Sequence, residues 1–435
     1  MQDLNSLKVS ELRELAKEMD IKGISGLKKS DLVTLLEDAF KQQQEEAKEV
    51  KKEEKKEPPK TDTLRVEGVL EEIEGKDFGF LRMDNFTSSD DDIYVSPVLI
   101  RKLGLVSGDK ITGDVKKNQE SDKFRALVYV HLVNGETPDK SIRRMRFDQM
   151  TPVHPYERIR LSHRFNEYST RLIDLVAPVG KGQRGLIVSP PKAGKTVLLQ
   201  NIARSIEENY PEITLMMLLI DERPEEVTEM KESIKSDVIY STFDELPSNH
   251  IRIAEMALQR AQALASMKKD VVILMDSITR LARAYNIETA SSGRTLSGGV
   301  DPAALYMPKK FFGAARKLKE GGSITILATA LIETGSRMDE VIFEEFKGTG
   351  NMELVLTRKF SEKRIFPAID IAKSGTRREE KLLQPEELEF VYGLRRNLDE
   401  THEALILEDL LKLIRQTKSN EEFIHIANKQ MGMRR

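Results

Sequence analysis

The sequence contains no cysteine among its 435 residues. A chain without cysteine has no disulfide scaffold, thiolate zinc site, iron–sulfur cluster or cysteine nucleophile. Its six histidines lie far apart, and no two of them have the spacing of metal ligands on one helix. Basic and acidic side chains nearly balance, with 69 Lys plus Arg against 72 Asp plus Glu. This balance excludes a globally basic nucleic-acid-binding coat but leaves room for a local basic groove.

Long hydrophobic runs are also missing. The longest mostly apolar run, residues 213–220, is far shorter than the roughly 18 residues of a membrane helix. The start, MQDLNSLKV, has no cationic segment followed by a hydrophobic one, as a secretory signal would. We therefore expect a cytoplasmic protein without membrane contact. The length suggests about three domains.

The first 60 residues divide into two parts. Residues 1–40 carry apolar side chains at helical spacing, which predicts a small helical N-terminal module. Residues 41–60 consist mainly of Lys, Glu and Gln, with Val50 as the only large aliphatic residue. Such a segment buries too little apolar surface to offset its ordering entropy. We interpret it as a charged linker, either a solvated helix or a tether, in preference to a binding tail.

The remaining chain changes pattern twice. Residues 61–135 contain five short β-type segments separated by Gly, Asp and Ser, which predicts a small barrel of the oligonucleotide-binding (OB) or cold-shock type. Residues 136–170 are irregular and basic, and we expect a connector there. From residue 171 to 435, apolar strand candidates alternate with helices, which indicates an α/β domain with a parallel sheet and a helical C-terminal end. The strand candidates are RGLIVS, ITLMMLLI, DVIYS, VVILM and SITILATAL.

The strongest motif is SPPKAGKT at residues 189–196, between an expected strand and an expected helix. A loop in this position directs backbone N–H groups and a helix N-terminus at phosphate oxygens. Lys195 can then reach the β- and γ-phosphates, and the Thr196 hydroxyl can ligate Mg²⁺. Ser189 stands where the P-loop pattern has Gly. The alternative, an accidental GKT at a helix cap, does not account for the strand–loop–helix context.

Carboxylates follow two other expected strands. Asp276 ends VVILM, where the acid that holds the magnesium shell is expected. Asp221 and Glu222 follow ITLMMLLI, and we choose Glu222 as the general base, although spacing alone does not separate the two. A transition-state arginine is also needed, and its candidates are Arg358, Arg364, Arg377 and Arg378.

Two kinds of segment predict contacts with nucleic acid. Phe78 and Phe80 share one face of a strand, and Tyr94 faces away from its apolar neighbours. With Arg82 nearby, these rings form either a stacking platform for single-stranded bases or part of the barrel core, and we favour the platform. The glycine-rich loops 288–302 and 333–340 carry Arg294 and Arg337, and they are either pore loops of a ring or plain flexible loops.

Taken together, these strings resemble the family of the bacterial transcription termination factor Rho, and the resemblance spans nearly the whole chain. Its most specific segments are PPKAGKT, DERPEEVTEM and EEFKGTGNMEL. The resemblance implies a hexameric RNA-dependent ATPase and helicase whose α/β domain is of the RecA type. It also implies ATP as substrate, Mg²⁺, single-stranded RNA, and RNA polymerase with its elongation factors as partners.

The resemblance also implies roles for individual residues. ATP would be bound by the P-loop and an adenine-stacking ring, through Lys192, Ala193, Gly194, Lys195, Thr196, Val197 and Phe366. Thr196 and Asp276 would hold the metal. Hydrolysis would use Glu222, Lys195, the site arginine Arg223, the in-trans finger Arg377, and Arg364. RNA would contact a primary site on the barrel (Phe78, Phe80, Arg82, Asp92, Tyr94 and Phe124) and pore residues (Arg294, Gly298, Gly299, Val300, Arg337 and the linked Lys347).

We therefore predict an ATP-driven RNA translocase that binds pyrimidine-rich single strands and terminates transcription by acting on the transcript. Two alternatives remain from the residues themselves. One is a DNA-directed ring helicase or rotary-type ATPase with the same α/β core. The other is a non-enzymatic RNA-binding protein with a degenerate P-loop.

Overall fold

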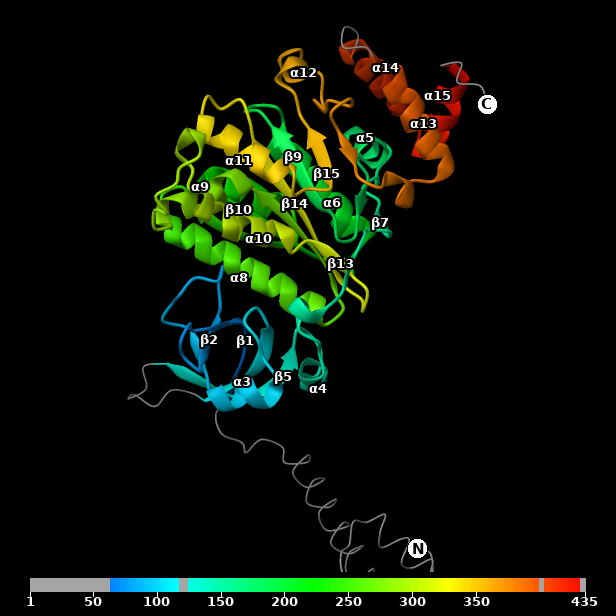
Figure 1. Ribbon diagram of the computed structural model, residues 1–435. Helices are drawn as coiled ribbons and strands as arrows, with labels where there is room; N and C mark the ends of the chain where they lie inside the picture. Colours follow the sequence, from blue (N-terminus) through cyan, green and yellow to red (C-terminus); the bar gives the residue numbers. More distant parts are fainter. Residues whose placement is uncertain (1–62, 117–123, 399–402, 431–435) are drawn as a thin grey trace, which may run out of the picture. The chain divides into compact units, whose positions relative to one another are not determined.

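The computed structural model of this chain describes residues 63–116, 124–398 and 403–430 (Figure 1). The predicted helical module (residues 1–40) and charged linker (residues 41–60) lie outside the described residues. Within the described part of the chain, no helix is both long and apolar enough to cross a membrane.

The first described element is a closed five-stranded barrel with strand order β1-β2-β3-β5-β4. This confirms the predicted OB-type barrel. Its strands and its one helix are β1 (Thr63–Glu72), β2 (Gly79–Arg82), β3 (Ile93–Val95), α3 (Pro97–Leu103), β4 (Lys110–Lys116) and β5 (Arg125–Val133). Alternation decides which side chains fill the barrel, because successive residues of a strand point to opposite faces. Leu81, Ile93 and Val95 are fully buried in its core.

The segment expected to be an irregular connector contains short regular elements. They are α4 (Pro138–Ile142), the 3₁₀ turn η3 (Phe147–Gln149), β6 (Pro152–Val153) and β7 (Arg158–Ile159). β6 pairs with β13 (Arg316–Leu318), and β7 pairs with β8 (Val179–Gly180). These partners lie far along the chain, so no local pattern could indicate the pairing.

The α/β domain is built on a mostly parallel sheet with strand order β11-β10-β12-β14-β9-β15-β16. All five predicted apolar segments form strands of this sheet, which confirms the predicted fold class. The strands are β9 (Arg184–Ser189), β10 (Thr214–Glu222), β11 (Asp237–Thr242), β12 (Asp270–Asp276), β14 (Ser323–Leu331), β15 (Met352–Val355) and β16 (Gly375–Thr376). β16 runs antiparallel to β15, and β13 runs antiparallel to β14.

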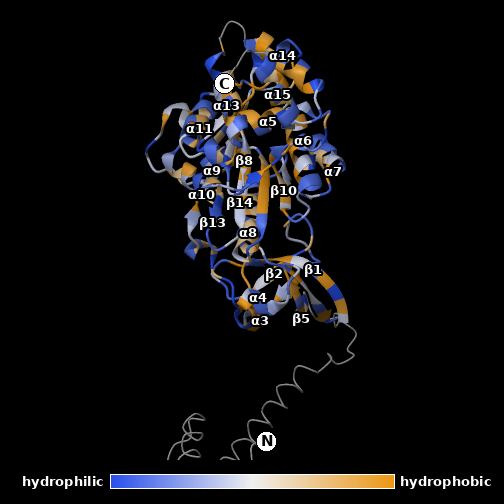
Figure 2. Cartoon of the chain, turned by 90° about the vertical axis from the view of Figure 1, so that its right-hand side faces the viewer, coloured by the Kyte–Doolittle hydropathy of each residue, from blue (hydrophilic) through white to orange (hydrophobic). Residues whose placement is uncertain are grey.

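Helices cover both faces of this sheet (Figure 1). One core contains Met217 and Leu219 of β10, and the other contains Met216 and Leu218 of the same strand. A strand buried on both faces has no polar alternation, which is why β10 is a continuous apolar run. In Figure 2 the central strands accordingly carry the hydrophobic colour.

The helices divide between the two cores. The first core includes residues of α5 (Tyr168–Val176), α6 (Lys195–Asn209), α7 (Pro224–Ser233), α12 (Arg358–Glu362), α13 (Pro385–Arg396), α14 (Glu403–Arg415) and α15 (Asn420–Gln430). The second includes residues of α8 (Pro247–Ser266), α9 (Ile278–Glu288), α10 (Tyr306–Gly313) and α11 (Arg337–Lys347). Short 3₁₀ turns complete the domain at η4 (Ser297–Gly299), η5 (Pro302–Leu305) and η6 (Glu379–Lys381).

Gly182, in the turn before β9, has a backbone φ of 95° and packs against the backbone of β13. A Cβ at this position would lie 2.1 Å from the Lys317 nitrogen. Gly293 has a similar φ of 75°, but a Cβ there would meet no atom within 4 Å.

We predict that Gly182→Ala destabilises the α/β domain by roughly 3 kcal/mol more than Gly293→Ala, because only the first change adds a backbone clash to the cost of positive φ. Urea unfolding followed by far-UV circular dichroism measures both variants. Equal losses in the two variants would contradict the close packing of the β8–β9 turn on β13.

Candidate functional site

The P-loop lies where the sequence predicts it, between β9 and α6. β9 ends at Ser189, and α6 begins at Lys195 with Gly194 as its N-cap. Gly194 and Lys192 adopt positive φ values of 87° and 64°, which bend the loop back around the helix N-terminus. Backbone N–H groups gathered in this way, together with the helix dipole, form a binding site for phosphate.

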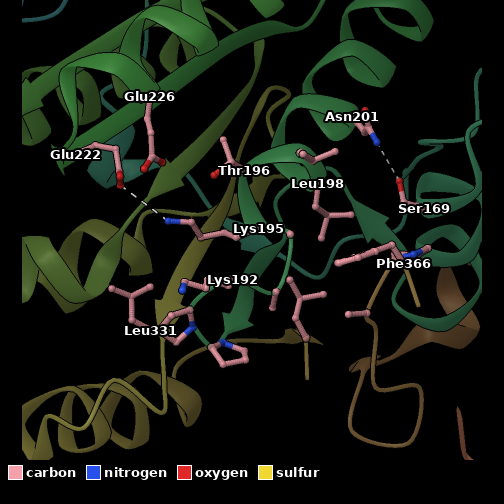
Figure 3. Close-up of a pocket in the computed structure, with 18 of the residues that line it drawn as sticks. Ser169, Lys192, Lys195, Thr196, Leu198, Asn201, Glu222, Glu226, Leu331 and Phe366 are labelled. Atoms are coloured by element: carbon pink, nitrogen blue, oxygen red, sulfur yellow. Dashed lines mark hydrogen bonds and ion pairs between the residues drawn. The ribbon is translucent and has the colours of Figure 1, made fainter. Parts of the chain in front are cut away.

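The strand order brings the predicted carboxylates to the same edge of the sheet as the P-loop. β10 and β12 are neighbours, and Leu219 of β10 pairs with Asp276 at the end of β12. Nζ of Lys195 lies 2.8 and 2.7 Å from the two Asp276 oxygens and 3.9 Å from Oε2 of Glu222. In Figure 3, Lys195 points from the P-loop toward Glu222. One ammonium group therefore faces two carboxylates.

Glu222 and Asp221 occupy different environments, although spacing in the sequence does not separate them. Glu222 is buried and lines the pocket, and its Oε2 is buried without a hydrogen-bond partner. Asp221 instead accepts a hydrogen bond of 2.7 Å from Nη1 of Arg280. Of the two carboxylates, only Glu222 faces the phosphate-binding loop with a free oxygen.

The environment of Glu222 changes its acidity. Burial, with a further contribution from the nearby charge of Asp276, raises its pKa to about 7. Lys195 opposes this shift and Glu226 adds to it. A carboxyl group with a pKa near the working pH can both accept and release a proton, as a general base must. Burial lowers the pKa of Lys195, but the carboxylates of Asp276 and Glu222 outweigh burial and raise it.

The pocket around this cluster has a volume of about 970 Å³. Residues from the N-terminus of α5, the P-loop and the segment 366–368 line it. Phe366 lies across the P-loop from Glu222 in Figure 3, and a Cβ on Gly194 would lie 3.5 Å from its ring. An aromatic ring beside a phosphate-binding loop suits a ligand with both a planar base and phosphates.

The donor set fits Mg²⁺ bound together with a nucleotide. Mg²⁺ in such sites keeps several waters and takes one or two protein oxygens plus substrate phosphates. Asp276, which contacts Lys195, and the Thr196 hydroxyl, which lines the pocket, offer oxygens of this kind. Among the described residues, no group of three or more His, Cys, Asp or Glu side chains is arranged to hold a metal ion.

Of the other residues predicted for this site, Arg223, Lys192, Ala193 and Val197 line the pocket. Arg364 and Arg377 do not line it. The structure places Arg377 directly after β16, where its side chain is exposed and its backbone N–H donates to Asn351 at 2.8 Å.

The sequence analysis missed several residues that shape the site. Oγ1 of Thr329 donates to Asp276 at 2.7 Å, and Arg280, Glu226 and Asp339 line the pocket. Asp339 is fully buried and accepts two hydrogen bonds from Arg283 at 2.8 and 2.6 Å. Only the order of the strands brings Thr329 beside Asp276, so no local pattern marked it.

A second candidate site lies on the barrel. The rings of Phe78, Phe80, Tyr94 and Phe124 contact one another, with centroid separations of 5.1 to 6.1 Å. None of them belongs to the barrel core. Four partly accessible rings on one face provide surfaces on which bases can stack.

Arg82 and Asp92 lie beside these rings but are buried. Nη1 of Arg82 donates to Asp92, and its Nε donates to Glu71 at 2.5 Å. The guanidinium carbon of Arg82 lies 5.4 Å from the centre of the Phe80 ring. The arginine is therefore fixed by two carboxylates and is not a mobile surface charge.

The two glycine-rich loops are neighbours in the structure. A Cβ on Gly298 would lie 2.8 Å from the backbone of Arg337, so η4 rests on the first turn of α11. Arg294 and Arg337 are exposed, as is Gly299, whereas Val300 is fully buried. Lys347 lies at the other end of α11, about 15 Å from Arg337 at the rise of an α-helix. The structure thus brings the two loops together but not Lys347.

Three family models match this chain. The nucleotide-binding domain of the ATP synthase alpha/beta family matches residues 169–376. The RNA-binding domain of the Rho termination factor matches residues 66–139, and the N-terminal domain of the same factor matches residues 3–44.

Relatives match over almost the full length. The chain is 50% identical over 427 residues to transcription termination factor Rho of Bacillus subtilis (strain 168), covering 98% of this chain and 96% of that protein. Rho of Haemophilus influenzae is 48% identical over 433 residues, covering 98% and 99%.

Solved structures resemble the ATPase part. A prototypical ATPase from the type III secretion system of pathogenic bacteria aligns with a TM-score of 0.53 at 25% identity, over 64% of this chain and 86% of that one. The ATPase EscN of enteropathogenic E. coli aligns with a TM-score of 0.52 at 22% identity, over 71% and 78%, a likeness of fold alone.

Fold and site together define an ATP-hydrolysing P-loop enzyme that carries an RNA-binding barrel. ATP is its substrate. Within this class, the chain belongs to the transcription termination factor Rho family, as the predicted resemblance indicated.

Proposed function

We propose that this protein is an RNA-dependent ATPase that moves along single-stranded, pyrimidine-rich RNA and terminates transcription by acting on the transcript. One observation supports this most strongly. The same chain carries a phosphate-binding pocket with Lys195, Asp276 and Glu222 in contact range and a barrel with four clustered aromatic rings. A rotary-type ATPase has no need of such a face, and an RNA-binding protein with a degenerate P-loop has no need of the complete carboxylate set.

In this proposal the chain divides into a helical module (1–40), a linker (41–60), the RNA-binding barrel (61–135), a connector (136–170) and the ATPase domain (171–435). Six copies form a ring in the cytoplasm, with RNA polymerase and its elongation factors as partners. Each pocket is completed by Arg377 and Arg364 of a neighbouring copy.

The chain's own residues carry the proposed hydrolysis. The P-loop amides and Lys195 bind the β- and γ-phosphates, Phe366 stacks on the adenine, and Arg223 lies at the pocket edge. Oε2 of Glu222 accepts a proton from the attacking water, since it is buried and accepts no hydrogen bond within the chain. Thr196 and Asp276 would hold Mg²⁺, which when bound supplies charge stabilisation on the transferring phosphoryl group.

RNA contacts two surfaces in this proposal. Bases stack on Phe78, Phe80, Tyr94 and Phe124, and Arg82 with Asp92 sets the edge of that site. Arg294, Gly298, Gly299 and Arg337 form the solvent-accessible part of the pore loops, the buried Val300 anchors them in the core, and Lys347 supports them from the far end of α11.

The function is tested by ATP hydrolysis with and without cytidine-rich RNA, coupled to a native mass measurement of the assembly. We expect strong stimulation by RNA, weaker stimulation by the matching DNA, and a hexamer in the presence of nucleotide. Equal stimulation by DNA would favour the DNA-directed helicase. Absence of hydrolysis under every condition would favour a non-enzymatic RNA-binding protein.

The raised pKa of Glu222 predicts that kcat/KM for ATP hydrolysis falls on the acid side of its pH profile. A general base must be deprotonated, so kcat/KM should fall as the pH drops below about 7. The charge of Glu226 contributes to raising that pKa. Glu226→Gln should therefore move the acid limb to lower pH, whatever its effect on the maximum rate.

The matched control for this profile is Glu225→Gln, which alters an exposed carboxylate in the same turn of α7. This variant should show the same acid limb of kcat/KM as the wild-type protein. Glu222→Gln should retain ATP binding and lose turnover. Glu222 would not be the general base if the acid limb of kcat/KM in Glu226→Gln lay at the wild-type pH. Normal turnover in Glu222→Gln would exclude it as well.

The stacking role predicts that Phe80→Ala weakens RNA capture by about 1–3 kcal/mol, the contribution of one base–aromatic stack. Fluorescence titration of an oligocytidine at fixed salt measures this change. Tyr129→Ala, which removes a half-exposed ring elsewhere on the barrel, is the control and should bind normally. Unchanged affinity in Phe80→Ala would exclude that ring from the RNA site.

A further inference from the structure

Glu71, near the end of β1, connects the barrel to helix α8 of the ATPase domain. Nε of Arg252 donates to its Oε1 at 3.1 Å, and Nη2 donates to its Oε2 at 2.8 Å. An arginine that donates to both oxygens of a carboxylate fixes direction as well as distance. Arg252 is thus held at a defined position against the barrel.

The same carboxylate also holds Arg82, whose Nε donates to Oε2 at 2.5 Å. Arg82 in turn donates to Asp92 and, at 3.1 Å, to the hydroxyl of Ser88. Two guanidinium groups therefore alternate with two carboxylates in one network. Only 8% of the Arg82 side chain and 2% of the Asp92 side chain are exposed, so water replaces these partners poorly.

One end of this network lies at the aromatic face. Glu71 is directly opposite Phe80 in the β1–β2 pairing, and Phe80 is opposite Tyr94 in the β2–β3 pairing. These side chains therefore share one face of the barrel. The guanidinium of Arg82 lies against the Phe80 ring. A base that stacks on this ring would therefore share the ring with the guanidinium group that Glu71 holds.

The other end lies against the strands that carry the nucleotide site. Ile253, next to Arg252, is buried in the same core as Ile220, two residues before Glu222. A second contact, in addition to that of Glu71 with Arg252, joins the barrel to the ATPase domain. The Asn85 side chain exchanges two hydrogen bonds, of 2.8 and 2.9 Å, with the backbone of Tyr240 in β11, which neighbours β10.

We propose that Glu71 and Arg252 are positioning residues that orient Arg82 at the aromatic face and tie occupancy of that face to the rate of ATP hydrolysis. If a bound base displaces Arg82, Glu71 remains paired with Arg252 alone. The displacement therefore changes the ion pair that α8 makes with the barrel. Linkage requires the reverse effect as well, so nucleotide in the pocket changes RNA affinity at the barrel. The inference rests on the proposed RNA-dependent ATPase activity.

The test is Arg252→Gln in the full-length protein, which removes the charge and keeps a polar side chain. We expect the Kd for an oligocytidine to rise by up to about tenfold at fixed salt, the usual effect of losing a hydrogen bond to a charged group. We also expect the ratio of the RNA-stimulated rate at saturating RNA to the RNA-free rate to fall. Arg252→Lys, which keeps the charge, should restore part of both quantities.

The matched control is Arg101→Gln, which removes an exposed arginine paired with Asp77 on the same barrel at 3.3 Å. It should keep the wild-type ratio. The inference is overturned if Arg252→Gln keeps both the wild-type Kd and the wild-type ratio. It is also overturned if the rates with and without RNA fall by the same factor, which indicates a merely structural role. A wild-type protein that RNA does not stimulate would instead overturn the proposed function itself.

Discussion

The nucleotide site depends on one ammonium group that lies within ion-pair distance of two buried carboxylates. Nζ of Lys195 lies within 2.8 Å of Asp276 and 3.9 Å from Glu222. Buried charges are costly unless they are paired, and this cation is the partner that both acids share. These three groups are held close together by the P-loop, by the ends of β10 and β12, and by the helices packed on both faces of the sheet.

The two carboxylates differ because their partners differ. Asp276 accepts a hydrogen bond from Thr329 as well as from Lys195, so each of these neighbours is a hydrogen-bond donor to it. Oε2 of Glu222 has only a longer ion-pair contact with the same cation, and it accepts no hydrogen bond. Its pKa is therefore raised to about 7, mainly by burial. Neighbouring acids in different environments can in this way take different chemical roles.

The elements that sequence reasoning predicted are those with local signals. The strands of the sheet are continuous apolar runs because both faces are buried, and the P-loop is specified by contiguous residues. What sequence reasoning missed depends on contacts between distant segments. Thr329 meets Asp276 only through strand order, and Arg252 meets Glu71 from a position 181 residues along the chain. The sequence pointed to Arg82 but did not show that two carboxylates surround it. A strand pattern indicates which face a side chain lies on, but it does not indicate the partners of that side chain.

Charge and burial also distinguish the two surfaces proposed to bind RNA. The chain carries a formal charge of −3, so attraction for a phosphate backbone has to be local. Arg294 and Arg337 are exposed and lie close in the chain to Gly293 and Gly335. Arg82 is already neutralised by Glu71 and Asp92, which leaves the stacking rings as the main source of affinity on the barrel. Binding at the barrel should therefore depend less on salt than binding at the loops, where exposed arginines would meet the phosphate backbone.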